Sequence, residues 1–218
     1  LRGDVPSRCE HWRASVRELI FRISEAEPLV YEESFRPLLE ASPEHWRYPL
    51  HTVMFRDSLA DIWELEVVAP FANFSLDASS TQVSRRILAR MEQTPHVFGA
   101  FSFINLHDNY LATEGIASLA ANQGLAGTTH LMLSGTVTGD EALECLLSSP
   151  HIGDLRALYL EDNRITDEGA AALAAFPGAS ELEVLELAGN TITAEGWSAL
   201  ASSPYLSREL RARFADLV

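Results

Sequence analysis

The residues best suited to chemistry lie between positions 103 and 134. His107 precedes Asp108, and His130 and Ser134 follow further along the chain. A serine beside a histidine that is held by a carboxylate is the arrangement of nucleophilic hydrolases, and histidines with carboxylates are potential zinc ligands. However, a catalytic serine needs a nucleophile elbow and an oxyanion hole, and zinc needs three or four converging ligands. The sequence has no HExxH, CxxC or phosphate-binding glycine motif. We therefore expect no catalysis, no metal and no cofactor.

The charge balance disfavours whole classes of partner. Sixteen basic residues stand against 31 acidic ones, which gives a net charge of -15. A chain this acidic is repelled by phosphate backbones and by anionic membrane surfaces. The sequence also has no apolar run of about 18 residues, the length that a membrane-spanning helix requires. We expect no nucleic-acid partner and no membrane partner.

The two cysteines favour a reducing compartment. Cys9 and Cys145 lie far apart, and a disulfide framework needs more cysteines at closer spacing. Cys145 stands among apolar helix positions and is expected to be a buried thiol. With no visible secretory signal, the expected location is the cytoplasm. Because the chain starts at Leu1, a removed signal segment stays an open alternative.

A repeat of 27 residues dominates the second half of the chain. Asn163 and Asn190 are separated by 27 residues, and the same step backwards reaches Thr136 and Asn109. The four units read Phe101-x-x-Ile104-x-Leu106-x-x-Asn109-x-Leu111, Thr128-x-x-Leu131-x-Leu133-x-x-Thr136-x-Thr138, Leu155-x-x-Leu158-x-Leu160-x-x-Asn163-x-Ile165 and Leu182-x-x-Leu185-x-Leu187-x-x-Asn190-x-Ile192. Fainter units begin at Asn73 and at Leu50. Repeats of this length predict a stacked array.

The full pattern is LxxLxLxxNxLxxxGxxxL, in which Thr136 and Ala142 mark one degenerate unit. This pattern resembles the ribonuclease-inhibitor type of leucine-rich repeats. The absence of lysine is typical of a GC-rich genome, and the charged C-terminal stretch resembles the endings of leucine-rich-repeat proteins common in GC-rich bacteria. The resemblance implies an α/β fold, a leucine-rich-repeat solenoid shaped as a curved horseshoe. Parallel strands would line its concave side and helices its convex side.

Local physical chemistry gives the same elements. Leu-x-Leu alternation is typical of a strand that buries one face. The asparagine falls where the chain must turn, and its amide can pair with backbone groups of neighbouring units. Starts such as Thr166-Asp167-Glu168 suit a helix N-terminus. Because one unit cannot bury its own apolar face, stability must come from neighbouring units.

The chain divides into four expected segments. Residues 1–48 are predicted to be a helical N-terminal cap, with helices over about 8–24 and 32–41, or alternatively a small separate module. Residues 49–100 would hold degenerate repeats, with a helix near 84–93, and residues 101–205 the four clear repeats. Residues 206–218 are expected to form a C-terminal capping helix. Its inward side chains would be Leu210, Phe214 and Leu217, with Arg208, Arg211 and Arg213 facing water.

The concave side is the expected binding surface. Repeat positions four and six should point into the core, which leaves positions three, five, seven and eight on the concave side. These positions carry an aromatic and methionine band beside an acidic edge, and such a band suggests a protein contact that favours a basic partner patch. The candidate residues are Phe103, Asn105, His107, His130, Met132, Ala157, Tyr159, Glu161, Val184 and Glu186. Alternatively, these side chains merely pack sideways along the sheet.

Two other functions stay open. In one alternative, the repeats serve as a structural or oligomerisation element of a larger protein. Ran GTPase-activating proteins also resemble ribonuclease-inhibitor-type repeats, so a GTPase-activating regulator is a less favoured alternative. No extended motif of that family is matched, so no functional residue is carried over. Arg164 is taken as the only exposed loop arginine of the clear repeats, and a GTPase assay with Arg164→Ala would test this alternative. Partner identity and oligomeric state are not fixed by the sequence.

Overall fold

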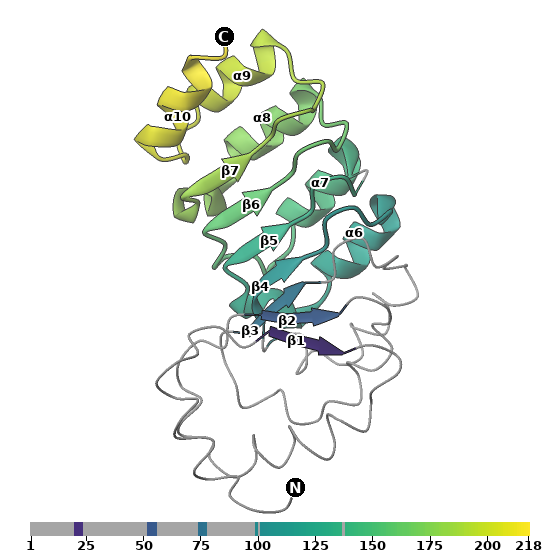
Figure 1. Cartoon of the computed structure of the whole chain (residues 1–218). Helices are drawn as coiled ribbons and strands as arrows, with labels where there is room; N and C mark the ends of the chain where they lie inside the picture. Colours follow the sequence, from purple (N-terminus) through teal and green to yellow (C-terminus); the bar gives the residue numbers. More distant parts are fainter. Residues whose placement is uncertain (1–19, 24–51, 56–73, 78–98, 100, 137) are drawn as a thin grey trace, which may run out of the picture.

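A single parallel sheet runs through the protein in chain order. The computed structural model describes residues 20–23, 52–55, 74–77, 99, 101–136 and 138–218 (Figure 1). Within these ranges the strands pair consecutively from β1 to β7. They are β1 (Ile20–Ile23), β2 (Thr52–Phe55), β3 (Phe74–Asp77), β4 (Phe101–Asn105), β5 (His130–Met132), β6 (Ala157–Tyr159) and β7 (Val184–Glu186). Each unit therefore adds one strand to the edge left by the unit before it.

The strand register follows the repeat. Ile104, Leu131, Leu158 and Leu185, all at position four, face one another across β4 to β7. The same register continues into the fainter units, because Leu76 is paired with Ile104 and Val53 with Leu76. The two faint units are therefore confirmed as strands of the sheet at the positions that the pattern gave them.

The first strand corrects the prediction for the N-terminal segment. Residues 20–23 were expected in a helix over about 8–24, but they form β1, which pairs with β2 from Ile20–Thr52 to Ile23–Phe55. The run Ile-Phe-Arg-Ile is rich in β-branched and aromatic residues, which fit a pleated sheet. Pairing with β2 outweighs the local helical pattern. The remainder of that helix and the helices expected at 32–41 and 84–93 fall outside the described residues.

Helices cover one face of the sheet. They are α6 (Ala112–Ala120), α7 (Gly139–Leu147), α8 (Asp167–Ala175) and α9 (Ala194–Ala201), and Figure 1 shows them as a second layer behind the strands. Short 3₁₀ turns, η4 (Gln123–Gly127) and η5 (Pro177–Glu181), lead back to β5 and β7. The threonine starts are confirmed, because Thr166 accepts a hydrogen bond from the Glu168 N–H and Thr193 from the Glu195 N–H. Each unit is thus a strand, a turn and a helix, as expected for an α/β solenoid.

The core lies between the sheet and the helices. The position-four residues and the position-six residues Leu106, Leu133, Leu160 and Leu187 are all at most 2% exposed, which confirms their prediction as core. The helices contribute Ile116, Leu119, Leu143, Leu146, Leu173 and Leu200. Cys145, predicted to be buried, is a half-buried free thiol. The apolar stripe therefore runs continuously from unit to unit.

The turn asparagines form a ladder between units. The Asn190 side-chain oxygen accepts the N–H groups of Asn163 and Ile165, both at 2.9 Å, and its amide donates to the Leu160 and Leu187 carbonyls. Asn163 repeats this towards Thr136 and Thr138. These bonds satisfy buried backbone groups that no strand partner reaches. The prediction that the asparagine amide serves neighbouring turns is confirmed.

A second ladder joins the helix starts, and sequence reasoning did not identify it. The Asp140 carboxylate accepts the Thr166 N–H, the Thr166 hydroxyl and the Gly169 N–H of the next unit at 2.9, 2.6 and 3.1 Å. Asp167 binds Thr193 and Gly196 in the same way. A Cβ at Gly169 would lie 2.4 Å from the Asp140 Oδ1 atom. The glycine of the repeat therefore makes room for the preceding unit's carboxylate.

The degenerate unit fits this rule. Ala142 occupies the glycine position, and the residue 29 positions before it is Thr113 rather than an aspartate. The corresponding intervals from Asp140 to Gly169 and from Asp167 to Gly196 are also 29 residues. An alanine is therefore accepted where no carboxylate must approach the backbone. The aspartate of one unit and the glycine of the next act as a pair.

We expect the substitutions Gly169→Ala and Asp140→Ala to be strongly non-additive. Each alone should destabilise the protein by about 1–3 kcal/mol, through a steric clash or through the loss of charge-assisted hydrogen bonds. Together they should cost clearly less than the sum, because the added methyl group then meets no carboxylate. Urea unfolding of the four proteins in the double-mutant cycle measures the coupling. Strict additivity would contradict the pairing.

The Asp167 ladder should make stability pH-dependent. The Thr193 hydroxyl and the Thr193 N–H lower the Asp167 pKa from 3.8, desolvation opposes them, and the Gly196 N–H lowers the pKa further. The folded state favours the carboxylate, so this stabilisation is present above the unfolded pKa and is lost as pH falls through the lower folded pKa. The difference in unfolding free energy between wild type and Asp167→Ala should therefore shrink below pH 3.8. A constant difference from pH 7 to pH 2 in urea unfolding would contradict this, with Glu183→Ala as an exposed control.

The last helix, α10 (Arg208–Ala215), packs against α9 at the C-terminal end. Leu210 and Phe214 are buried as expected, and the Phe214 ring stacks on Trp197 with 5.7 Å between centroids. The prediction for Leu217 is wrong, since it is 54% exposed beyond the end of the helix. Arg208 and Arg213 are exposed as expected, but Arg211 departs from the expected solvent-facing role. Arg211 is half-buried, and Arg213 reaches back to β7, donating to the Leu185 carbonyl and the Glu186 carboxylate.

Candidate functional site on the concave face

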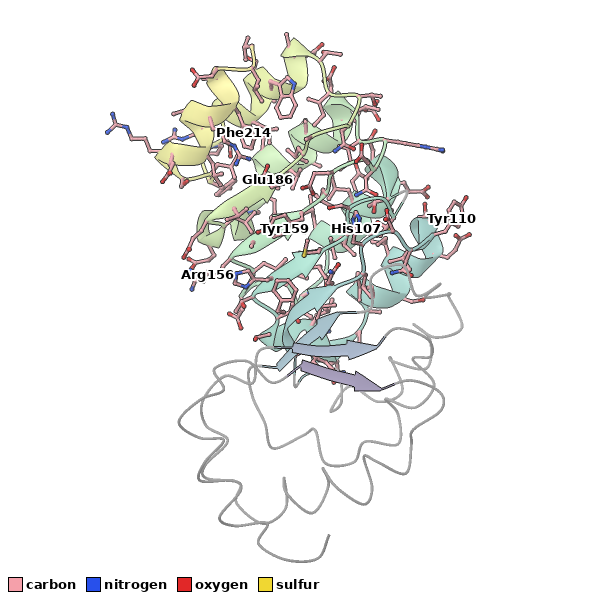
Figure 2. All side chains as sticks on the ribbon, viewed as in Figure 1. His107, Tyr110, Arg156, Tyr159, Glu186 and Phe214 are labelled. Atoms are coloured by element: carbon pink, nitrogen blue, oxygen red, sulfur yellow. The ribbon has the colours of Figure 1, made fainter. Side chains whose placement is uncertain are left out.

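Two rows of side chains cross the face of the sheet opposite the helices, which we call the concave face. Position three aligns Phe103, His130, Ala157 and Val184, and position five aligns Asn105, Met132, Tyr159 and Glu186. Figure 2 shows Tyr159 and Glu186 on neighbouring strands of this face. The strand register thus brings eight of the ten candidate residues into two contiguous rows.

The band is half-buried rather than freely exposed. Phe103, His130, Met132 and Tyr159 are all partly covered, and the Phe103 and His130 rings lie 5.8 Å apart at a tilt of 31°. Ala157 is only 1% exposed, so its side chain offers almost no surface. Sideways packing along the sheet therefore does account for part of the row. It also fixes these side chains in place, which lowers the conformational entropy lost when a ligand binds.

Position seven follows the strands. The Ser134 hydroxyl donates to the Glu161 carboxylate at 2.5 Å, and the His107 Nε2 atom lies 3.1 Å from an Asp108 carboxylate oxygen. The backbone N–H of His107 donates to the side-chain oxygen of Asn105. Ser134 is thus bound to an acid rather than to a histidine. Among the described residues no group of three potential metal ligands converges.

Position eight is a tight turn instead of a flat strand position. Asp108, Gly135, Asp162 and Gly189 all have positive φ angles, from 56° to 72°. The aspartates alternate with glycines, and each aspartate carboxylate leans over the glycine of the next unit. A Cβ at Gly135 would lie 2.6 Å from the Asp108 Oδ1 atom. The close approach of the carboxylate requires a glycine there, whereas aspartate itself adopts the same left-handed backbone at Asp108 and Asp162.

Two predictions about charged residues, one for Glu186 and one for Arg164, need correction. Glu186 was expected to offer a charge to a partner, but Arg213 of α10 pairs with it at 2.8 Å. Arg164 is exposed in a left-handed turn, as expected for a loop, but it is not the only such arginine. Arg156 is exposed at the start of β6, where Figure 2 shows it, and pairs with Glu181 at 2.6 Å. No sequence spacing marked these pairs, because they join different units.

These features define a solenoid of leucine-rich repeats. Residues 154–174 and 180–201 match the family model described as Leucine Rich repeat. This part of the chain therefore carries leucine-rich repeats. No curated protein sequence matches the chain. Among solved structures, the chain is similar to an internalin from Listeria monocytogenes at 14% identity and a TM-score of 0.42, over 72% of this chain and 46% of the internalin chain.

In the described part of the chain, none of the helices has the length and apolar character needed to cross a bilayer.

Proposed function

We propose that this protein binds a partner protein through the concave face of its repeats, without catalysis or a cofactor. The observation that carries the proposal is the row of partly exposed side chains at position five, where Met132 and Tyr159 lie side by side in register. Tyrosine and methionine are enriched in protein interfaces. Stacked repeats offer such an extended surface without any rearrangement of the backbone.

The packing of the row supports a preformed interface. Position three forms the neighbouring row on the same face, where Phe103 and His130 contact each other across β4 and β5. A tyrosine held by its neighbours supplies a large contact area at low entropic cost. The polar residues His107, Ser134 and Glu161 at position seven lie along one edge of this row, as polar residues border the apolar centre of known interfaces. An apolar core with a polar rim favours a protein over a small molecule.

A photo-crosslinking experiment tests the proposal. The photoreactive residue p-benzoylphenylalanine is placed at Tyr159 in the full chain and exposed to lysate of the native host. We expect a discrete adduct from this position and none from Ala171, which is exposed on α8 at the opposite face. The adduct should disappear when Met132→Asp is added, because the charge disrupts the neighbouring contact.

Thermal melting must show that each variant stays folded. Adducts that form equally from position 171 would contradict the concave face as the binding surface. An adduct between two copies of this chain would instead support the oligomerisation alternative. Light scattering over a range of concentrations would then show the self-association directly.

A further inference from the structure

The concave face carries carboxylates that converge on one turn from both sides. Asp108 of the first clear repeat leans over Gly135, and Glu161 of the third accepts the hydroxyl of Ser134. Both carboxylates therefore lie against the dipeptide Ser134–Gly135 of the repeat between them. We call these four residues the acidic notch. Sequence position alone does not show this, because Asp108 and Glu161 stand two repeats apart.

The acidic notch continues the apolar row. Met132 is the last residue of β5 and precedes Ser134 by two residues, and Tyr159 is the last residue of β6 and precedes Glu161 by two. Met132 and Tyr159 are paired in register at the ends of these strands, directly before the turns that hold Ser134 and Glu161. Two residues of extended chain span at most about 7 Å, so the apolar pair lies within about 7 Å of the notch along the backbone. One extended segment spans both features.

No basic side chain of the clear repeats neutralises the notch. Positions three, five, seven and eight of the four repeats hold no arginine or lysine. Arg213 reaches this face, but it pairs with Glu186 on the last strand. Arg156 pairs with Glu181 at the opposite ends of the strands. His107 touches Asp108 but carries a charge only when protonated. Within the part of the chain that the structure describes, the two carboxylates of the notch are therefore not paired with an arginine.

We infer that the partner presents an arginine or lysine to the acidic notch and an apolar side chain to Met132 and Tyr159. This inference rests on the proposed function and specifies the chemistry of the partner segment. Charge complementarity carries it, because like-charged partners are repelled and a cation gains hydrogen bonds to two carboxylates. Arginine suits such a site well, since its planar guanidinium binds carboxylates in a fixed geometry.

The test is a selection from a displayed library of random dodecapeptides on the full-length protein. We expect the enriched peptides to carry an excess of arginine or lysine together with aromatic or aliphatic residues. Their affinity should fall by about tenfold or more in the variant Asp108→Asn/Glu161→Gln, as for a lost charged hydrogen bond. Asn tolerates the left-handed turn, and Gln still accepts the Ser134 hydroxyl.

The matched control is Glu168→Gln/Glu195→Gln, which removes two exposed carboxylates from the helices and should leave affinity unchanged. An equal loss in both variants would overturn the inference, because only net charge would then matter. Peptides that lose binding on Tyr159→Asp but have no basic excess would overturn it and leave the proposed function standing. Peptides that ignore Tyr159 would contradict both. A selection without enrichment would overturn the inference alone, because crosslinking at Tyr159 tests the proposed function independently.

Discussion

Replacing Leu160 by aspartate should unfold the entire array of repeats. Leu160 is fully buried at position six, where an ionised carboxylate would have no partner. Burying an unpaired charge and losing the apolar side chain together cost more than about 4 kcal/mol, against a total stability of about 5–15 kcal/mol for a protein domain. Each repeat is stabilised by its neighbours, so the loss should spread beyond one unit.

Circular dichroism and urea unfolding measure this effect. The graded variant Leu160→Ala should cost about 2–5 kcal/mol, which is less than the aspartate. The control Ala171→Asp places the same charge on the exposed side of α8 in the same repeat and should leave the fold intact. A Leu160→Asp protein that melts near the wild-type temperature would contradict the burial of position six.

The second large effect is expected at Phe214. This residue is 1% exposed, stacks on Trp197 and lies under the Arg213 guanidinium, which is 5.1 Å from the ring centre. Replacing it by alanine should cost about 3–5 kcal/mol of local stability. Among the described helices, only α9 makes extensive contact with α10. We therefore expect α10 to detach before the repeats unfold.

Hydrogen exchange tests this order. The amides of residues 208–215 should exchange much faster in Phe214→Ala, while those of β5 and β6 keep most of their protection. Leu217→Ala is the matched control, since Leu217 is 54% exposed and its loss should change little. Uniform acceleration along the chain would show that α10 is coupled to the whole array. Unchanged exchange in α10 would contradict its packing and its predicted role as a cap.

The sequence predicted the repeated elements because their signals are local and repeated. The leucine spacing set positions four and six, and both proved to be buried in every clear repeat. The asparagine ladder was also predictable, because an amide that recurs at a turn must meet the same backbone groups each time. The helix over 8–24 failed at β1, where strand pairing outweighs a local pattern. The helical preference of a short segment does not include the free energy that the segment gains when it pairs with a distant strand.

The aspartate–glycine ladder had a signal that the repeat pattern alone did not expose. Asp140 and Asp167 each precede a glycine by 29 residues, whereas Thr113 precedes Ala142. Only the comparison of one unit with the next reveals that the glycine of a unit depends on the aspartate of the unit before it. The physical reason is steric, because the carboxylate occupies the space of the missing Cβ. A consensus averaged over units hides such a pair.

The amino-acid sequence by itself determined the repeat, the strand face that is buried and the set of residues on the concave face. These follow from periodicity, which is a property of neighbouring residues along one chain. Tertiary structure alone decided which of those side chains are covered or already paired within the protein. Arg213 pairs with Glu186, Ala157 is covered, and Asp108 and Glu161 meet at Ser134–Gly135. Such contacts join residues about 27 or more positions apart, and only the stacking of repeats sets their distance.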